Sequence, residues 1–275
     1  MLSYRHSFHA GNHADVLKHL VLFLVADYLT RKDKPLVYVD THAGAGMYQL
    51  DQAHARKNHE YLSGIQKLYD AESQPVLINN FVNLIYSITH NNKTLYPGSP
   101  AIAQALLKEH HRLMLHELHP TDLHRLMQLM SVDKRVRVIG NDGYQGLISI
   151  VPPKERRALV LIDPPYEIKQ DYQLIVTTLE KACKRFATGV YLLWYPIVQR
   201  SRIERLHHQI EQLNLPFTIA ELQVAPDNDD HGMTGSGMVI LNPPYPLAEQ
   251  LQELLPWLSV TLAGQQGKFS LRTNR

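Results

Sequence analysis

Five apolar residues at positions 158–162 lead directly into Asp163-Pro164-Pro165-Tyr166, which combines a carboxylate, two prolines and an aromatic ring. This set suits alkylation of the exocyclic amine of a nucleobase, whose lone pair is delocalised until acceptors engage the amine hydrogens. Asp163 can accept one hydrogen and take the released proton, and the backbone carbonyl of Pro164 can accept the other. The prolines stiffen the turn, and the ring of Tyr166 offers a face for an unstacked base. The structural alternative is a strand that ends in a turn with a solvated Asp.

A second candidate, Asn242-Pro243-Pro244-Tyr245, has the sequence of a variant of the same catalytic loop. The expected strand order separates the two. Asp163 should end the fourth parallel strand, beside the crevice where the strand order of a doubly wound sheet reverses. Asn242 ends the last strand of an expected antiparallel pair, so it should lie at the opposite rim. We therefore assign catalysis to the segment at Asp163 and interpret Asn242 to Tyr245 as a turn into the final helix.

A glycine-containing loop follows an earlier expected strand at residues 36–39. Asp40 precedes Gly44 and Gly46 in this loop, and the third glycine of a dinucleotide fingerprint is missing. Glycines at the carboxyl end of a first strand let the backbone approach a ligand. An acid ahead of them suits a ligand without a pyrophosphate whose amino-acid end is positively charged. S-adenosylmethionine is such a ligand.

Acidic residues also follow the next two expected strands. Glu117 follows residues 113–116, where an acid can hold the two hydroxyls of a ribose, and Asp142 follows residues 136–139, where it can face an adenine edge. Each acid alone is compatible with a solvated strand end. Because the carboxyl ends of parallel strands meet at one rim, these acids and Asp163 together predict one crevice for S-adenosylmethionine.

The composition is that of a globular protein of 275 residues, 44% hydrophobic and 20% charged, with room for one large core and a small insertion. A net charge of +2 means that affinity for nucleic acid must come from local patches. The clusters Lys154-Arg156-Arg157 and Lys181-Lys184-Arg185 are candidates, although each is also compatible with a solvated face. A single cysteine, Cys183, excludes a disulfide framework. With no signal core and no apolar run near the roughly 20 residues that span a bilayer, we expect a cytoplasmic protein.

Strands alternate with helices along most of the chain, which predicts a doubly wound α/β fold with a mostly parallel sheet. We expect seven strands, the terminal one antiparallel. No strand repeat occurs between residues 47 and 93, where two amphipathic helices, 59–69 and 77–89, indicate a helical insertion. The expected organisation is residues 1–46 for the N-terminal motif, helix and first strand, 47–94 for the insertion, and 95–275 for the rest of the core.

The chain resembles the bacterial RlmJ family in five separate segments. They are Tyr4-Arg5-His6-x-Phe8-His9-Ala10-Gly11-Asn12-His13-Ala14-Asp15-Val16-x-Lys18-His19, Asp40-Thr41-His42-Ala43-Gly44-Ala45-Gly46, Pro97-Gly98-Ser99-Pro100, Asp163-Pro164-Pro165-Tyr166 and Gly235-Ser236-Gly237-Met238. The N-terminal segment is far more specific than the catalytic tetrapeptide, and the resemblance spans essentially the whole chain without a departure at these positions. That family methylates N6 of one adenine in 23S ribosomal RNA, so the resemblance implies an active methyltransferase of this kind.

The resemblance also implies a Rossmann-like class I methyltransferase fold with S-adenosylmethionine as cofactor and a small helical subdomain inserted after the first strand. Together with the glycine loop, it predicts that these residues contact the cofactor or close its pocket: His19, His42, Gly44, Ser99, Glu117, Asp142, Gly143 and Asp163. Asp163, Pro164 and Tyr166 would act on the target base. Tyr4, Arg5, His6 and Lys18 would contact the RNA.

Four of the 16 histidines gather near the N-terminus, at His6, His9, His13 and His19. Their spacings fit no standard zinc pattern, and we expect no metal. Helix-capping and core roles are one interpretation. The resemblance favours another, a mobile segment that contacts cofactor and RNA.

Three other functions are compatible with parts of the sequence. A DNA adenine methyltransferase shares the chemistry but normally carries a target-recognition module after the catalytic strand, and the loop at 227–232 is too small for one. A protein glutamine methyltransferase uses Asn rather than Asp at the first catalytic position. A catalytically inactive RNA-binding protein would not be expected to keep every acid of the crevice. We therefore expect a monomeric enzyme that acts on 23S ribosomal RNA, without membrane or metal.

Overall fold

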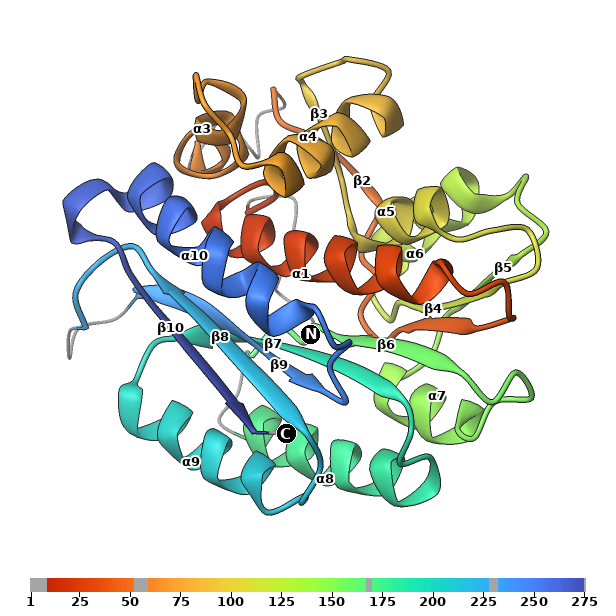
Figure 1. Ribbon diagram of the computed structural model, residues 1–275. Helices are drawn as coiled ribbons and strands as arrows, with labels where there is room; N and C mark the ends of the chain where they lie inside the picture. Colours follow the sequence, from red (N-terminus) through yellow and green to blue (C-terminus); the bar gives the residue numbers. More distant parts are fainter. Residues whose placement is uncertain (1–8, 52–58, 167–169, 228–231, 275) are drawn as a thin grey trace.

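One sheet runs through the centre of the molecule (Figure 1). The computed structural model describes residues 9–51, 59–166, 170–227 and 232–274. The strands of the sheet are β1 (Val37–Asp40), β4 (Arg112–His116), β5 (Val136–Ile139), β6 (Ala158–Ile162), β7 (Val190–Ile197), β8 (Phe217–Gln223), β9 (Gly235–Leu241) and β10 (Lys268–Asn274). Their order is β10-β8-β9-β7-β6-β1-β4-β5. The five strands from β7 to β5 are parallel, whereas β9, β8 and β10 pair in antiparallel fashion.

Helices cover both faces of the sheet, as Figure 1 shows. On one face lie α1 (His13–Thr30), α5 (Ser99–Leu106), α6 (Pro120–Met130) and α10 (Leu247–Ala263), the last followed by the short η3 (Gly264–Gln266). On the other lie α7 (Gly143–Ile150), α8 (Gln170–Arg185) and α9 (Arg200–Glu211). Side chains alternate between the faces along a strand. In β1, accordingly, Tyr38 packs into the first core while Val37 and Val39 pack into the second.

Helix α1 is buried along almost its whole length, which explains why it is apolar on nearly every side. The side chain of Asn12 caps it by accepting hydrogen bonds from the backbone N–H groups of Ala14 and Asp15, both at 3.0 Å. The helix packs against α5, α10 and strand β9. Its polar residues are therefore held inside the protein, where each needs a partner.

The expected insertion contains a strand as well as helices. Between residues 47 and 94 lie β2 (Met47–Gln49), η2 (Glu60–Ser63), α3 (Ile65–Tyr69) and α4 (Val76–Ile88), and β3 (Leu95–Pro97) follows directly. β2 and β3 pair as a separate two-stranded sheet. The single helix expected over 59–69 is divided at Gly64, where a Cβ would lie 2.0 Å from the carbonyl oxygen of Gly11. The boundaries 47–94 remain a prediction.

The sheet has eight strands in the described residues, not the seven expected. The additional strand is β10, which lies at the edge of the sheet and pairs only with β8. Most of its residues are exposed, so it carries little of the apolar alternation that identifies a half-buried strand. The mostly parallel sheet and its antiparallel end are confirmed.

Candidate active site

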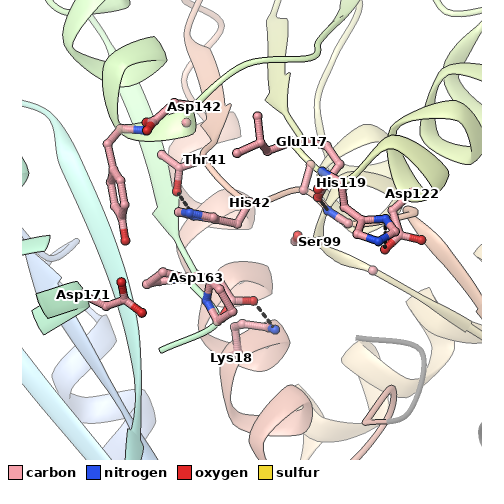
Figure 2. Close-up of a pocket in the computed structure, with 18 of the residues that line it drawn as sticks. Lys18, Thr41, His42, Ser99, Glu117, His119, Asp122, Asp142, Asp163 and Asp171 are labelled. Carbon is pink, nitrogen blue, oxygen red and sulfur yellow. Dashed lines mark hydrogen bonds and ion pairs between the residues drawn. The ribbon is translucent and has the colours of Figure 1, made fainter. Parts of the chain in front are cut away.

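A cavity of about 220 Å³ lies at the rim where β1, β4, β5 and β6 end. Figure 2 shows side chains from all four strand ends and from α1 converging on it. Every residue predicted to bind the cofactor lines this cavity: His19, His42, Gly44, Ser99, Glu117, Asp142, Gly143 and Asp163. Pro164 and Lys18 line it too. The fold thus brings Lys18 and Asp163, 145 positions apart in the sequence, into one site. That the predicted residues contact a cofactor remains a prediction.

Glu117 connects the glycine loop after β1 to the loop after β4. One carboxylate oxygen accepts a hydrogen bond from the Gly44 N–H at 2.7 Å, and the other accepts from the His119 N–H at 2.6 Å. Gly44 has a φ of +62°, and a Cβ there would meet the hydroxyl of Tyr48 at 2.2 Å. Burial raises the pKa of Glu117, which the two N–H donors partly oppose. The glycine loop is therefore fixed by a partly buried acid.

The loop after β5 lies in backbone contact with the loop after β1. Asp142 caps α7 by accepting hydrogen bonds from the N–H groups of Tyr144 and Gln145, at 2.8 and 3.0 Å. At Gly143 a Cβ would lie 1.8 Å from the carbonyl oxygen of Thr41, so the position has no room for a side chain. The close approach shapes a narrow wall of the cavity.

Histidine side chains on the cavity wall are held by hydroxyl groups. The Thr41 hydroxyl lies 2.8 Å from Nδ1 of His42, and the Tyr96 hydroxyl lies 2.8 Å from Nδ1 of His19. The ring of His42 packs edge-on against Tyr144. Burial lowers the pKa of His42 to about 4. The imidazole is therefore neutral near pH 7 and does not repel a cationic ligand.

Asp40 does not line the cavity, in contrast to the expectation that it faces the charged end of a cofactor. Its carboxylate is fully buried and accepts hydrogen bonds from the hydroxyls of Tyr38 and Ser99, both at 2.7 Å, and from the N–H of His42 at 3.3 Å. Burial raises the pKa of Asp40 to about 6. Asp40 thus positions Ser99 and His42 on the cavity wall.

The carboxylate of Asp163 is paired with Lys18 of α1. The ammonium nitrogen lies 2.5 Å from Oδ2 of Asp163 and 2.8 Å from Oδ1 of Asp15, and Figure 2 shows the first of these contacts. The Lys18 side chain is 4% exposed and that of Asp163 14%. Burial alone would lower the pKa of Lys18, but the two carboxylates raise it above its ordinary value. The lysine stays charged inside the protein.

This placement of Lys18 corrects its assignment as an RNA contact. An ammonium buried between two carboxylates is not accessible to a phosphate. It also lies 5.8 Å from the ring centre of Trp194. The other expected RNA contacts, Tyr4, Arg5 and His6, lie outside the residues that the structure describes.

Tyr166 lies beside the cavity but is not among the residues that line it. Its φ is +52°, and its hydroxyl donates to the carbonyl oxygen of Trp194 at 2.6 Å. The ring packs against Tyr172 and Trp194, with centroid distances of 4.7 and 5.8 Å. The phenol is therefore anchored, and stacking of a base on its ring remains a prediction.

The second Pro-Pro-Tyr segment lies at the opposite rim, as strand order predicts. β9 is antiparallel to β7, and the side-chain amide of Asn242 donates to the carbonyl oxygens of Ala187 and Gly189, just before β7 begins. Asn242 itself has a φ of +53°, and Tyr245 is 76% exposed. The interpretation of this segment as a turn ahead of α10 is confirmed.

Six further polar residues line the cavity without having been predicted from the sequence: Thr41, Tyr48, His119, Asp122, Tyr144 and Asp171. Thr41 belongs to the glycine-loop segment and could have been included on that basis. His119 and Asp122 lie at the start of α6, and Asp171 lies in the first turn of α8. In the sequence, such residues indicate the beginning of a helix and not a binding site.

The described residues contain no group of three or more His, Cys, Asp or Glu that could hold a metal ion. None of the helices in the same part of the chain is long and apolar enough to cross a membrane.

A doubly wound sheet with a glycine loop, successive acids and an Asp-Pro-Pro segment at its carboxyl rim defines a Rossmann-like class I methyltransferase. The family model described as "Ribosomal RNA large subunit methyltransferase D, RlmJ" matches residues 33–273. The chain belongs to this family of enzymes.

Two curated relatives carry the name "Ribosomal RNA large subunit methyltransferase J". The one from Escherichia coli is 49% identical over 94% of this chain and 93% of its own length. The one from Haemophilus influenzae is 48% identical over 95% of this chain and 94% of its own. A crystal structure of protein LPL1258 from Legionella pneumophila superposes with a TM-score of 0.90 at 36% identity, covering 97% of this chain and 98% of that one. The whole architecture, with the insertion, is therefore shared.

Proposed function

We propose that the protein transfers a methyl group from S-adenosylmethionine to N6 of one adenine in 23S ribosomal RNA. The observation that carries this proposal is the position of Asp163 and Pro164 in the same cavity as the glycine loop and its acids. The names of the relatives support ribosomal RNA as the substrate. We further propose that the enzyme works in the cytoplasm as a monomer.

The residues of the cavity fit S-adenosylmethionine. Gly44 and Gly143 line the cavity and lie where a Cβ would strike a neighbouring residue, so only glycine allows the surrounding loops to pack this closely. Five carboxylates from strand ends and first helical turns, including Glu117 and Asp142, surround the space and suit a cationic ligand. When bound there, S-adenosylmethionine supplies an electrophilic methyl group. His19, His42 and Ser99 would complete the wall around it.

Asp163 and Pro164 prepare the target amine. Lys18 holds Oδ2 of Asp163, and no described residue donates a hydrogen bond to Oδ1. Oδ1 can therefore accept one hydrogen of N6 while the carbonyl oxygen of Pro164 accepts the other, which frees the nitrogen lone pair for attack. The proton released from N6 passes to Oδ1. Burial of the carboxylate excludes water, so positioning supplies most of the rate enhancement.

The adenine must leave its RNA context to reach this cavity. Tyr166 remains our proposed platform for the extruded base, because its hydroxyl fixes the ring beside Pro165 at the cavity edge. Tyr4, Arg5 and His6 remain proposed RNA contacts.

Paired alanine variants test the assignment. Asp163→Ala should abolish methylation of 23S ribosomal RNA taken from cells that lack the enzyme, because N6 then loses its acceptor. Calorimetric binding of S-adenosylmethionine should persist. Asn242→Ala, in the second Pro-Pro-Tyr segment, is the matched control and should retain full activity at a stability cost of about 1 to 3 kcal/mol, since it leaves two carbonyl groups without their donor.

The methylated nucleotide should be mapped from labelled cofactor, with a DNA duplex as the competing substrate. Activity in Asp163→Ala, or methylation of DNA in preference to the RNA, would overturn the proposal.

A further inference from the structure

A second groove of about 450 Å³ adjoins the cavity, between helices α7 and α8. Asp142, Tyr144 and Leu174 line both spaces, so the groove begins at the mouth of the active site. It is otherwise lined by Gln145, Ile148, Ser149, Thr178, Lys181 and Arg185. Nothing in the proposed methyl transfer uses this groove.

One polar group at the groove is a donor without a structural partner. The hydroxyl of Tyr144 is buried and has no partner among the described residues. By contrast, Asp142 caps α7, and the Ser149 hydroxyl donates to the carbonyl oxygen of Gly146 at 2.7 Å. Thr178, 4% exposed, adds a further hydroxyl to the lining. A buried hydroxyl is normally hydrogen-bonded, so the unpaired one at the mouth of the groove points to a ligand with acceptor oxygens.

Two cations from α8 complete the groove. Arg185 is held in place by a hydrogen bond from Nε to the carbonyl oxygen of Val151 at 2.9 Å, which leaves the far side of the guanidinium fork for a ligand. Lys181 lies one helical turn earlier, on the same wall. Lys184, by contrast, does not line the groove and pairs with Glu180 at 2.7 Å.

Resting on the proposed function, we propose that this groove is a phosphate-binding site that holds the backbone of the RNA strand beside the target adenine. Lys181 and Arg185 supply the charge and Thr178 a hydrogen bond. Paired cations with hydroxyl donors are the usual partners of phosphate oxygens. Because the groove opens from the active-site cavity across Leu174, a strand whose base occupies the cavity can continue into it.

The test measures binding of a fluorescently labelled 23S ribosomal RNA fragment containing the target by anisotropy across a salt series. Lys181→Gln and Thr178→Val should each weaken binding about three- to fivefold. Lys181→Gln should also reduce the slope of log affinity against log salt by about 0.7, the value for one lost contact to a single strand. Lys184→Gln, on the same helix but outside the groove, should change neither quantity. Thermal unfolding of Thr178→Val should stay close to that of the native protein, because Val keeps the shape of the Thr side chain.

A second arm uses adenosine monophosphate, which would occupy the groove if it were a site for a free nucleotide rather than for an RNA strand. In that case Lys181→Gln would lose nucleotide binding while RNA binding stays intact. Equal RNA affinity for Lys181→Gln and Lys184→Gln would overturn the proposal, as would loss of nucleotide binding with RNA binding intact. Methyl transfer is measured separately at saturating RNA. Its absence in the native protein would reject the proposed function and leave the groove result standing.

Discussion

Lys18 places a single buried positive charge between the carboxylates of two aspartates. Asp15 on its own helix and Asp163 at the end of β6 both lie within 3 Å of its ammonium group. A carboxylate buried without such a partner is strongly destabilising. The pairing therefore stabilises the fold and, through one contact, positions the carboxylate that we propose acts on the target amine.

Replacing Lys18 with Met removes this charge while keeping the length of the side chain. The free energy of unfolding should fall by about 3 to 5 kcal/mol, the usual effect of breaking a buried pair. Denaturant titration measures it. Arg31→Met is the control, since Arg31 pairs with Asp27 on the surface of the same helix and should cost about 1 kcal/mol or less. Equal losses in the two variants would contradict this account.

Asp40 should make stability depend on pH in an unusual direction. The folded pKa is about 6 and the ordinary value is 3.8, so the folded state binds more protons between these values. The contribution of Asp40 to the free energy of unfolding is therefore fully present below pH 3.8 and is lost as the pH rises through 6. Relative to the native protein, Asp40→Asn should gain up to about 3 kcal/mol between pH 4 and 7 and show no further change above it. If the difference in stability between Asp40→Asn and the native protein stayed constant from pH 4 to 7, the raised pKa of Asp40 would be refuted.

At the scale of elements, the site depends on loops whose backbones touch. The turn after β1 and the start of α7 meet at Thr41 and Gly143, and the glycine loop is held to the turn after β4 by Glu117. Each strand end thereby fixes its neighbour, which is how flexible segments present a defined surface to a ligand.

A methyl group at Gly143 should separate these loops. In Gly143→Ala the added Cβ would collide with the backbone at Thr41, so calorimetry should show affinity for S-adenosylmethionine reduced by at least about tenfold. Gly264→Ala provides the comparison. Gly264 has a positive φ, unlike Gly143, but nothing lies within 4 Å of its Cβ position. That variant should lose about 1 to 3 kcal/mol of stability and no affinity. If the two variants bound S-adenosylmethionine with similar affinity, the contact between Gly143 and Thr41 would not determine the shape of the cavity.

At the scale of the whole molecule, strand β10 forms one edge of the central sheet. β8 is almost entirely buried, and β10 pairs with it along its full length. Without β10 the backbone donors and acceptors of β8 would form an open edge, which is a common route to aggregation.

Truncation after Gly267 tests this role of β10. The shortened protein should elute from size-exclusion chromatography as aggregates and unfold at a lower temperature. Phe269→Ser, which keeps the strand and changes one half-exposed side chain, should remain monodisperse. A truncated protein with native elution and an unchanged midpoint would show that β8 tolerates an open edge.

Sequence reasoning succeeded where a residue's role follows from its place after a strand. Glu117, Asp142 and Asp163 each follow an apolar run, and parallel topology brings such positions together. It failed where the role depends on a distant partner. Asp40 has the same local signature, yet Tyr38 and Ser99 enclose it. Nothing adjacent to Lys18 in the sequence indicates that Asp163 will lie beside it.

Helices and strands, too, were predictable where the signal is local and were missed where it is not. Buried strands and the long amphipathic helices were predictable because their periodicity records burial. β10 was missed because an exposed edge strand carries little such pattern. The interruption at Gly64 was missed because it arises from contact with the backbone of Gly11, more than fifty positions earlier.

The two Pro-Pro-Tyr segments differ in which residue turns left-handed. In the first it is the tyrosine that closes the segment, and in the second it is the asparagine that opens it. The shared Pro-Pro-Tyr sequence therefore adopts two different bends, one that directs an aromatic ring back over β7 and one that leaves it exposed to solvent. The position of the left-handed residue thus distinguishes the segment at the cavity from the one at the opposite rim, independently of strand order.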